Sequence, residues 1–489
     1  MIFPMCRSLS ILLLIFLSGL LRGLTIEGYS ATSNDRFAND PSFIANSFDL
    51  SGVAISSDGK WATMISPNVF LTANHYTPGT GQTLTFYQTN DPSGPSVTRT
   101  VNSTQLRIGS SDLRLVTLDI PLPEGYTFYT VETRPINNYW GQYGNEEHFH
   151  LGRSPGNYAT SRDIGVGKNV VDIRYSNRVI SSPQASGPAI ECKKDSGNDA
   201  IPYETYAVGG DSGAPLMIDN NGTLKLIGIS WYQTTTTEDE VTSPYSTGFS
   251  PVGDYHDDID DFLDDYSLPF QPLAPENFAA IRISDTQINL SWTDASEVET
   301  DYNLTRAESA DGPWTEIASI SADSESYQDL SASDTDLYYR LVARNLKDIT
   351  SYSDSDGVEI SVLTPYSIWA AQYDWQGADQ SPTGDANNDG IQNLLAYSMN
   401  LSPLDTLPTD ALPTLEVSTT YIDYSYRINT EATELSYSLI SCNDLLDPDW
   451  QPVQVNGTTI TETIVADRIR IRMQADQLLF PLYFRLQVQ

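Results

Sequence analysis

The sequence contains few cysteines, few histidines and few basic residues. Of its 489 residues, three are cysteine and four are histidine, and 26 Lys and Arg stand against 64 Asp and Glu. Cys6 lies in the expected signal segment at the N-terminus, and Cys192 and Cys442 fall in regions of different sequence character. We therefore expect cores that fold without a disulfide. The formal net charge of −38 repels phosphate backbones and anionic membranes, which argues against nucleic acid as a partner.

The sequence also lacks a segment that could cross a bilayer. Its most apolar run, residues 8–21, is shorter than the about 20 residues that a spanning helix needs. Arg7 precedes this run, and the combination is typical of an export signal. We therefore expect residues 1–23 to be a signal peptide and the protein to be secreted, extracellular or associated with the cell surface, with no membrane span.

Short strand-like runs joined by turn residues make up most of the remainder. The 28 tyrosines outnumber the 15 phenylalanines, and together with abundant Thr, Ser, Asn and Asp this composition favours an all-β fold. Runs at 61–66, 113–120 and 225–232 follow this pattern. Residues 255–266 then show helical periodicity, which predicts a β-barrel region closed by an amphipathic helix. The apolar face of that helix consists of Tyr255, Ile259, Phe262, Leu263 and Tyr266.

Three further regions follow a Pro-containing linker at 268–276. Residues 273–364 alternate apolar and polar side chains, which suits a small β-sandwich with a buried tryptophan. Its inward-facing residues include Ile288, Leu290, Trp292, Leu337, Tyr339 and Leu341. Residues 365–411 are expected to be an Asp/Asn-rich helical linker, and residues 412–489 a C-terminal β domain. The helical face of the linker is predicted at Ile391, Leu394, Leu395 and Met399.

Three segments carry candidate catalytic side chains. In GGDSGAPL (209–216), a glycine turn can present the hydroxyl of Ser212 and aim the amides of Gly210 and Ser212 at one point, as an oxyanion hole requires. In LTANH (71–75), an apolar strand ends in a turn that delivers His75, a side chain suited to proton transfer near neutral pH. In SSDLRLV (110–116), Asp112 opens an apolar strand, where a carboxylate can be buried beside an imidazole.

Each segment alone also has a structural interpretation. A serine between glycines can be an ordinary β-turn, a strand-end histidine can make a structural hydrogen bond, and an aspartate can cap a turn. A structural role is what we expect for His148, His150 and His256. Asp119 is a rival to Asp112, but its position inside the apolar run makes it a poorer orienting group.

Taken together, the three segments resemble the trypsin-like serine peptidases in residue type, local context and order. LIGISWY (226–232) and the 255–266 helix resemble that family's substrate-pairing and closing segments, so the resemblance covers about residues 26–268. It implies a trypsin-like double β-barrel at 24–268. It further implies a secreted serine endopeptidase that hydrolyses protein or peptide substrates through an acyl-enzyme and uses no cofactor for catalysis. The implied catalytic triad is His75, Asp112 and Ser212.

Two departures from the family and one further resemblance complete this picture. Tyr76 and Val208 stand where the family usually has cysteines, so both of its common disulfides are absent. LAPENF, INLSW and YYRLVARN resemble a fibronectin type III module, which makes the sandwich at 273–364 fibronectin type III-like.

The same resemblance places a substrate pocket at Tyr206, Ser230, Trp231 and Tyr232. Tyr206 provides no carboxylate for a basic substrate side chain, and burying an unpaired cation is costly. Tyr232 takes the position of the glycine that usually opens the pocket wall. We therefore expect a shallow pocket that prefers small or medium apolar residues before the scissile bond. Glu238, Asp239 or Glu240 could instead fold back and supply a charge.

A calcium loop is a candidate at 385–393, where oxygen-bearing groups recur at every second position. They are Asp385, Asn387, Asp389, the Ile391 carbonyl and Asn393. This spacing, with Gly390 at the sixth position, is that of an EF-hand loop. Ala396 stands where a bidentate glutamate is expected. An Asx-rich structural turn is the alternative, and the sequence leaves both open.

Two other functions also stay open at this stage. A catalytically inactive trypsin-like homologue could act as an adhesive or binding protein, although binding alone gives no chemical need for three triad residues. An esterase would use the same triad, but the order His, Asp, Ser argues against the nucleophile elbow of the α/β-hydrolases. The sequence does not determine the oligomeric state.

Overall fold

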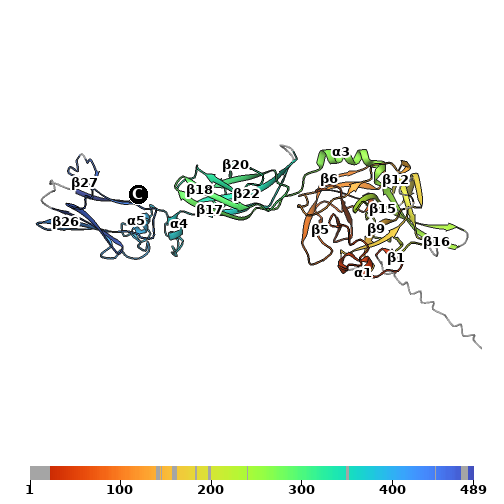
Figure 1. Ribbon diagram of the computed structural model, residues 1–489, viewed down its shortest axis with the longest axis horizontal. Helices are drawn as coiled ribbons and strands as arrows, with labels where there is room; N and C mark the ends of the chain where they lie inside the picture. The colour runs from red at the N-terminus through yellow and green to blue at the C-terminus, as the bar shows by residue number, and fades with distance from the viewer. Residues whose placement is uncertain are drawn as a thin grey trace, which may run out of the picture.

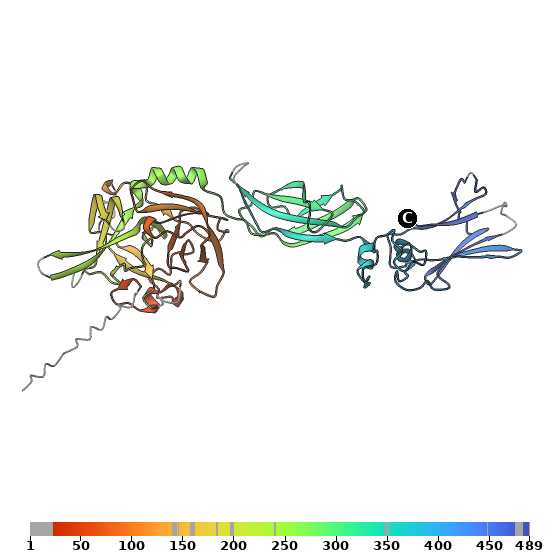
Figure 2. The same ribbon diagram turned by 180° about the vertical axis from the view of Figure 1, so that it is seen from behind.

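The computed structural model describes residues 23–138, 144, 146–156, 162–181, 184–195, 200–238, 241–347, 352–446, 448–474 and 483–488. The expected signal peptide therefore lies outside the described residues, apart from Gly23. The described chain is all-β with a few short helices, as the composition predicts. It forms three bodies in a row (Figure 1), which the view from behind in Figure 2 separates equally clearly. We call them the N-terminal body (24–266), the middle sandwich (276–362) and the C-terminal body (365–488).

The first half of the N-terminal body is a closed barrel with the strand order β2-β3-β4-β7-β6-β5. Its core contains large apolar side chains with almost no exposure, among them Trp61, Phe70 and Phe86. The strands are β2 (Val53–Ser56), β3 (Trp61–Met64), β4 (Val69–Ala73), β5 (Thr83–Tyr87), β6 (Ser96–Arg107) and β7 (Leu113–Leu118).

The second half of this body is an eight-stranded sheet with the order β10-β9-β14-β15-β16-β12-β11, and β8 pairs with β15. The pairing thus closes one barrel rather than the expected two. The edge strand β10 is instead covered by other segments through the bridges Asp35–Gly165 and Lys168–Glu204. The strands are β8 (Thr130–Val131), β9 (His148–Arg153), β10 (Ile164–Asn169), β11 (Ile173–Ser181), β12 (Gln184–Lys193), β14 (Pro215–Asn220), β15 (Thr223–Glu238) and β16 (Val241–Pro251).

Short elements complete the N-terminal body. The expected closing helix is α3 (His256–Tyr266), and it buries Ile259 and Phe262 in the core shared by the two halves. Its last predicted face residue, Tyr266, is 45% exposed. The other elements are β1 (Thr25–Ile26), α1 (Ala31–Asn34), η1 (Arg36–Ala38), η2 (Asn74–Tyr76), β13 (Thr205–Tyr206) and η4 (Val252–Tyr255).

The middle sandwich has two sheets, β17-β18-β21 and β20-β19-β22-β23, with β24 paired to β22. All six side chains predicted to face inward are buried in its core, which confirms the alternation read from the sequence. The strands are β17 (Glu276–Ser284), β18 (Gln287–Thr293), β19 (Asp301–Ala307), β20 (Thr315–Ser321), β21 (Ser326–Asp329), β22 (Leu337–Leu346), β23 (Tyr352–Asp354) and β24 (Val358–Val362).

The C-terminal body begins with α4 (Pro365–Ala370) and α5 (Asn393–Ser398), followed by sheets β25-β26-β30-β29 and β28-β27-β31. The predicted helical face is confirmed at Met399, which is buried, and at Ile391, which packs against the same core. It is wrong at Leu394 and Leu395, which are 46% and 37% exposed. Ala396 and Tyr397 are buried instead, in an aromatic core with Trp369 and Trp375. The strands are β25 (Thr414–Val417), β26 (Tyr421–Arg427), β27 (Tyr437–Cys442), β28 (Gln451–Pro452), β29 (Ile460–Val465), β30 (Arg468–Gln474) and β31 (Tyr483–Val488).

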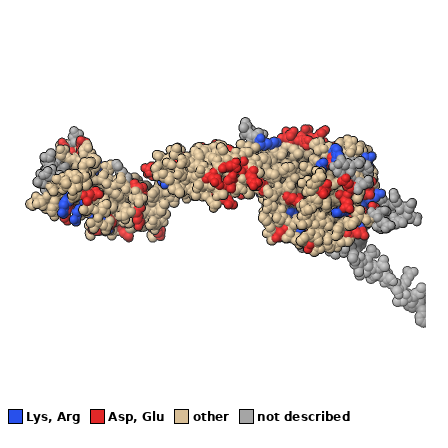
Figure 3. All heavy atoms as spheres, in the orientation of Figure 1, with Lys and Arg blue, Asp and Glu red and all other residues tan. Residues whose placement is uncertain are grey.

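Two expectations from composition can be compared with the structure. Cys192 and Cys442 are both buried and free, so the prediction of no disulfide between them is confirmed. Within the described residues, no helix has the length and apolarity needed to cross a membrane. Figure 3 shows acidic side chains gathered over α3 and near the middle of the molecule, with few basic ones between them.

Candidate functional site

His75 and Asp112 meet because of how β4 and β7 pair. The strands are antiparallel with Ala73 opposite Leu113, so the residues just beyond that pair lie together at the same end. The backbone amide of Asn74 donates to the carbonyl of Asp112 at 2.7 Å. The amide of His75 donates to Asp112 Oδ1 at 3.0 Å, and His75 Nδ1 lies 2.6 Å from Asp112 Oδ2. The carboxylate is thus held to both the backbone and the ring of the histidine.

Asp112 is 1% exposed. Burial raises its pKa above the usual range, while the hydrogen bonds and charge of His75 oppose that shift. A buried carboxylate paired with one imidazole nitrogen fixes which nitrogen carries the proton.

Ser212, from the second half of the body, lies beside the other ring nitrogen of His75. Its Oγ lies 3.0 Å from His75 Nε2. The loop that carries it is fastened to β15, because Gly213 N donates to Ser230 O and Ser230 N donates to Ala214 O, each at 2.9 Å. The structure therefore brings the three predicted catalytic residues into one hydrogen-bonded row.

Gly213 lets the serine loop approach the strand that carries the histidine. Its φ is +93°, and a Cβ built there would lie 2.9 Å from Thr72 Oγ1 and 3.3 Å from Trp61 Cβ. A side chain would therefore be strained and would push Ser212 away from β4.

The amides of Gly210 and Ser212 are the expected oxyanion donors. Within the described residues, the neighbouring amides of Asp211, Gly213 and Ala214 are used in backbone hydrogen bonds, whereas those of Gly210 and Ser212 are not. Gly210 has a φ of +103°, and its carbonyl accepts from Trp61 Nε1 at 3.3 Å. The two amides can thus donate to an external oxygen, as an oxyanion hole requires.

Asp211, next to the serine, is a buried carboxylate whose environment the sequence did not reveal. Its Oδ1 accepts from the amide of Arg153 and its Oδ2 from the amide of Val208, both at 2.9 Å. Burial raises its pKa to about 7, although these donors and the charge of Arg153 act in the opposite direction. Arg153 ends β9, so Asp211 ties the serine loop to the neighbouring strand.

The predicted pocket residues divide into two groups. Ser230, Trp231 and Tyr232 follow one another on β15 and are all buried. Tyr206 lies apart from them, in β13, where it pairs with Thr25 and its ring faces Lys194 Nζ at 5.9 Å.

The Tyr232 ring on β15 lies over the neighbouring strand β16. It stands opposite Gly248, and a Cβ on that glycine would lie 2.2 Å from the tyrosine ring. Its hydroxyl donates at 2.7 Å to Glu191, whose carboxylate is also 3.6 Å from Arg178. Glu191 is a buried acid beside the predicted pocket residue Tyr232. Sequence reasoning missed it, because only strand pairing places β12 next to β16.

The remaining candidates in the N-terminal body lie away from this row. Asp119, the rival of Asp112, is exposed beyond the far end of β7 and accepts from Thr100 N at 2.9 Å. Burial lowers the pKa of His148 to about 4 and that of His150 to about 3. His256 lies 3.2 Å from Asp260 on α3. Asp239 and Glu240 lie outside the described residues, as does the side chain of Glu238.

The 385–393 loop is folded on its own side chains. The two Asp385 oxygens accept from the amides of Asp389 and Gly390, and Asp389 Oδ1 accepts from Ile391 N. Asn393 is 1% exposed and donates to the carbonyls of Asp379 and Ser381. These contacts describe an Asx-rich turn, and they do not decide between that role and calcium binding.

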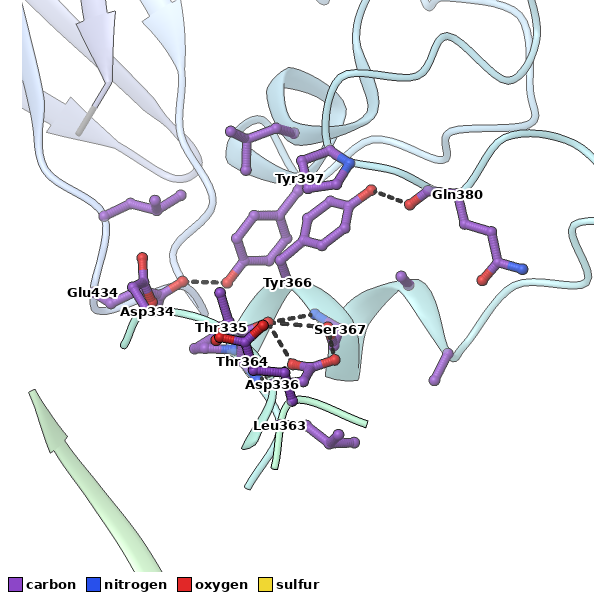
Figure 4. Close-up of a pocket in the computed structure, with 17 residues that line it drawn as sticks. Asp334, Thr335, Asp336, Leu363, Thr364, Tyr366, Ser367, Gln380, Tyr397 and Glu434 are labelled. Carbon is purple, nitrogen blue, oxygen red and sulfur yellow. Dashed lines mark hydrogen bonds between the residues drawn. The ribbon is translucent and has the colours of Figure 1, made fainter. Parts of the chain in front are cut away.

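A hollow of about 740 Å³ lies between the middle sandwich and the C-terminal body (Figure 4). Two of its carboxylates already serve local structure. Asp336 accepts from Thr364 N at 2.7 Å and from Ser367 Oγ at 2.6 Å at the start of α4, and Glu434 accepts from the Tyr397 hydroxyl. The hollow separates two bodies and contains none of the catalytic candidates.

Comparison with known proteins adds little to this geometry. No family model and no curated protein matches the chain. Among solved structures, an Fn3-like protein from Clostridium thermocellum shares 27% sequence identity with it, over 19% of this chain and 94% of that chain, with a TM-score of 0.17.

The pH dependence of stability should expose Asp211. Its folded-state pKa of about 7 exceeds the about 3.9 of an unfolded aspartate, so between these values the folded state binds more protons. The contribution of Asp211 to the free energy of unfolding is therefore complete below about pH 4 and is lost as the pH rises through about 7.

Calorimetry of Ser212→Ala protein from pH 4 to 8, with and without Asp211→Asn, measures this contribution. We expect the stability difference between the two proteins to change across that window. Asp219→Asn, at an exposed turn, should leave the pH dependence unaltered. If the stability of the proteins with and without Asp211→Asn changed equally with pH, the raised pKa of Asp211 would be contradicted.

Proposed function

We propose that this chain is a secreted serine endopeptidase of the trypsin-like type, with a fibronectin type III-like module as its middle sandwich. The observation that supports it is the row in which His75 lies 2.6 Å from Asp112 and 3.0 Å from Ser212. The motif order supports the same function, as do the amides of Gly210 and Ser212, for which the described part of the chain provides no backbone acceptor. The expected signal peptide supports export.

In this proposal each residue has one chemical role. His75 Nε2 accepts the proton of Ser212 as Oγ attacks the substrate carbonyl. Asp112 keeps the Nδ1 proton in place and stabilises the imidazolium that forms. The amides of Gly210 and Ser212 donate to the oxyanion, and His75 returns its proton to the leaving amine. Water then repeats the cycle on the acyl-enzyme.

The first test is removal of the nucleophile. We expect Ser212→Ala to lower kcat for peptide hydrolysis by at least about a thousandfold, because loss of a triad member costs orders of magnitude. A fluorophosphonate probe should label the wild type at Ser212 and leave the variant unlabelled. Ser212 is only half-buried, so the unfolding temperature should hardly change.

Ser103→Ala, at an exposed position of β6, is the matched serine control and should keep full activity. An unlabelled wild type, or more than about 1% residual activity in Ser212→Ala, would refute the triad. The first of these results would favour a binding protein.

The two aspartates of the 110–123 segment give a matched pair. Asp112→Asn presents an amide to His75 Nδ1 and favours the wrong tautomer, so kcat should fall by about 10⁴. Asp119→Asn makes the same chemical change at the exposed end of β7 and should have no effect on kcat. Equal activities of the two variants would remove Asp112 from the mechanism.

Tyr232 limits the proposed specificity pocket. Its ring lies against Gly248, and its hydroxyl donates to Glu191. A substrate side chain would therefore find little space there, and the Glu191 carboxylate would already be engaged. We expect cleavage after small or medium apolar residues in a peptide library. Tyr232→Gly should shift that preference towards larger apolar residues without loss of probe labelling. Dominant cleavage after Arg or Lys by the wild type would overturn this specificity while leaving the triad untouched.

A further inference from the structure

Three carboxylates meet at one end of the middle sandwich. Asp294 and Glu299 lie in the loop between β18 and β19, and Asp323 lies in the turn between β20 and β21. Strand pairing brings these connections together, because Asp301 stands opposite Ser321 and Ser291 opposite Ser326. One carboxylate oxygen from each acid lies within 4.8 Å of the other two.

Glu299 is the member of this group that ordinary packing leaves incomplete. It is 8% exposed. Its Oε1 accepts from the amide of Asp323 at 3.1 Å, but within the described residues its buried Oε2 has no hydrogen-bond partner. A buried carboxylate oxygen without a partner is costly, and this one lies beside two further acids.

The neighbouring groups described below do not neutralise the charge of these acids. The Tyr302 hydroxyl, a neutral group, donates to Asp294 at 2.7 Å. The four arginines of the described sandwich bond to other groups. Arg282 donates to the carbonyls of Ser333 and Thr335, and the other three pair with other carboxylates. Their partners are Asp329 for Arg306, Glu359 for Arg340 and Asp301 for Arg344.

We propose that Asp294, Glu299 and Asp323 bind a calcium ion. The ligand set is made of carboxylate oxygens, which hard cations prefer. Calcium binds oxygens at about 2.3–2.6 Å in flexible geometry, so ligands up to about 5 Å apart fit around it, whereas magnesium needs a smaller, near-octahedral cage. The ion gives the buried Glu299 oxygen the partner that it lacks.

A cation at this site would also order a loop that contacts the N-terminal body. Within the same loop, the amide of Glu297 donates at 2.9 Å to Oε2 of Glu124, which lies beyond the barrel strands. Oε1 of Glu124 accepts at 2.9 Å from Leu273 of the linker. A cation at Glu299 therefore orders the loop through which the sandwich contacts the N-terminal body. The site does not depend on the proposed peptidase activity.

Terbium luminescence of the full chain tests this proposal directly. Terbium replaces calcium, and Tyr302, hydrogen-bonded to Asp294, is placed to sensitise it. The Ser212→Ala background prevents self-cleavage without touching the site. We expect bound terbium to be displaced by calcium far better than by magnesium, and calcium to raise the unfolding temperature over that in chelator.

Two substitutions test proposed ligands, and two others serve as controls. Glu299→Gln keeps the shape of the buried side chain, and Asp323→Asn suits its left-handed backbone, with φ +59°. Each should weaken terbium binding by at least about tenfold, since even outer-sphere partners of a metal contribute that much, and should abolish the calcium-dependent stabilisation. Glu297→Gln removes a neighbouring charge in the same loop, and Asp389→Asn removes one in the 385–393 loop. Neither should weaken the Tyr302-sensitised site.

Three results would overturn the proposal. They are unchanged terbium affinity in both Glu299→Gln and Asp323→Asn, equal displacement by magnesium, and a signal that disappears only in Asp389→Asn. The last would assign the cation to the 385–393 loop instead.

Discussion

The pairing register of β4 and β7 is the constraint on which the candidate site depends. With Ala73 opposite Leu113, the chain leaves one strand at His75 and enters the other at Asp112, so the two side chains meet without a long-range loop. A slip of one residue would turn alternate side chains to opposite faces and separate them. The serine loop is then added from the other sheet, and Gly213 permits its close approach. The barrel thus positions His75 and Asp112, and Gly213 allows the loop with Ser212 to approach them.

Buried acids in this very acidic chain are stabilised in different ways, and the differences indicate their roles. Asp211 accepts two backbone amides, which suits a rigid tie between a loop and a strand. Glu191 accepts a tyrosine hydroxyl beside an arginine, which suits a closed pocket wall. Asp112 faces a titratable ring, the arrangement expected of a group that responds to proton transfer. Among the described residues, none gives a partner to one oxygen of Glu299, and a cation is the partner that its neighbours could help to hold.

The sequence predicted those features that depend on local pattern. The catalytic candidates stand at strand ends within recognisable segments, and the alternation around Trp292 identified buried positions in the middle sandwich. It failed where packing partners decide the outcome. The predicted helical face at 391–399 was wrong at its two leucines, because Ala396 and Tyr397 pack against Trp369 and Trp375 in their place. Periodicity alone cannot select these residues over the larger leucines. The second barrel was not found as expected, because edge coverage depends on distant segments.

The acid cluster of the middle sandwich was beyond sequence reasoning for the same reason. Its members come from two separate connections, and only the register of β19 with β20 brings Glu299 next to Asp323. The EF-hand-like spacing at 385–393 is recognisable in the sequence, since its candidate ligands lie close together at every second position. Local spacing is visible in a sequence, whereas a site assembled from loop ends is visible only once strands are paired.

The linker between the first two bodies shows how composition can mislead about stiffness. Its prolines suggest a spacer, yet its backbone is hydrogen-bonded on both sides. Gln271 exchanges backbone bonds with Leu122 and Glu124 of the N-terminal body, and its side chain donates to Asp354 O in the sandwich at 3.0 Å. Ser353 and Asn345 donate to the linker carbonyls of Pro269 and Phe270. A hinge at this point would have to break several of these bonds together, so the N-terminal body and the sandwich should move as one unit. The order of the 294–300 loop then matters to both bodies, because Glu124 connects that loop to the linker.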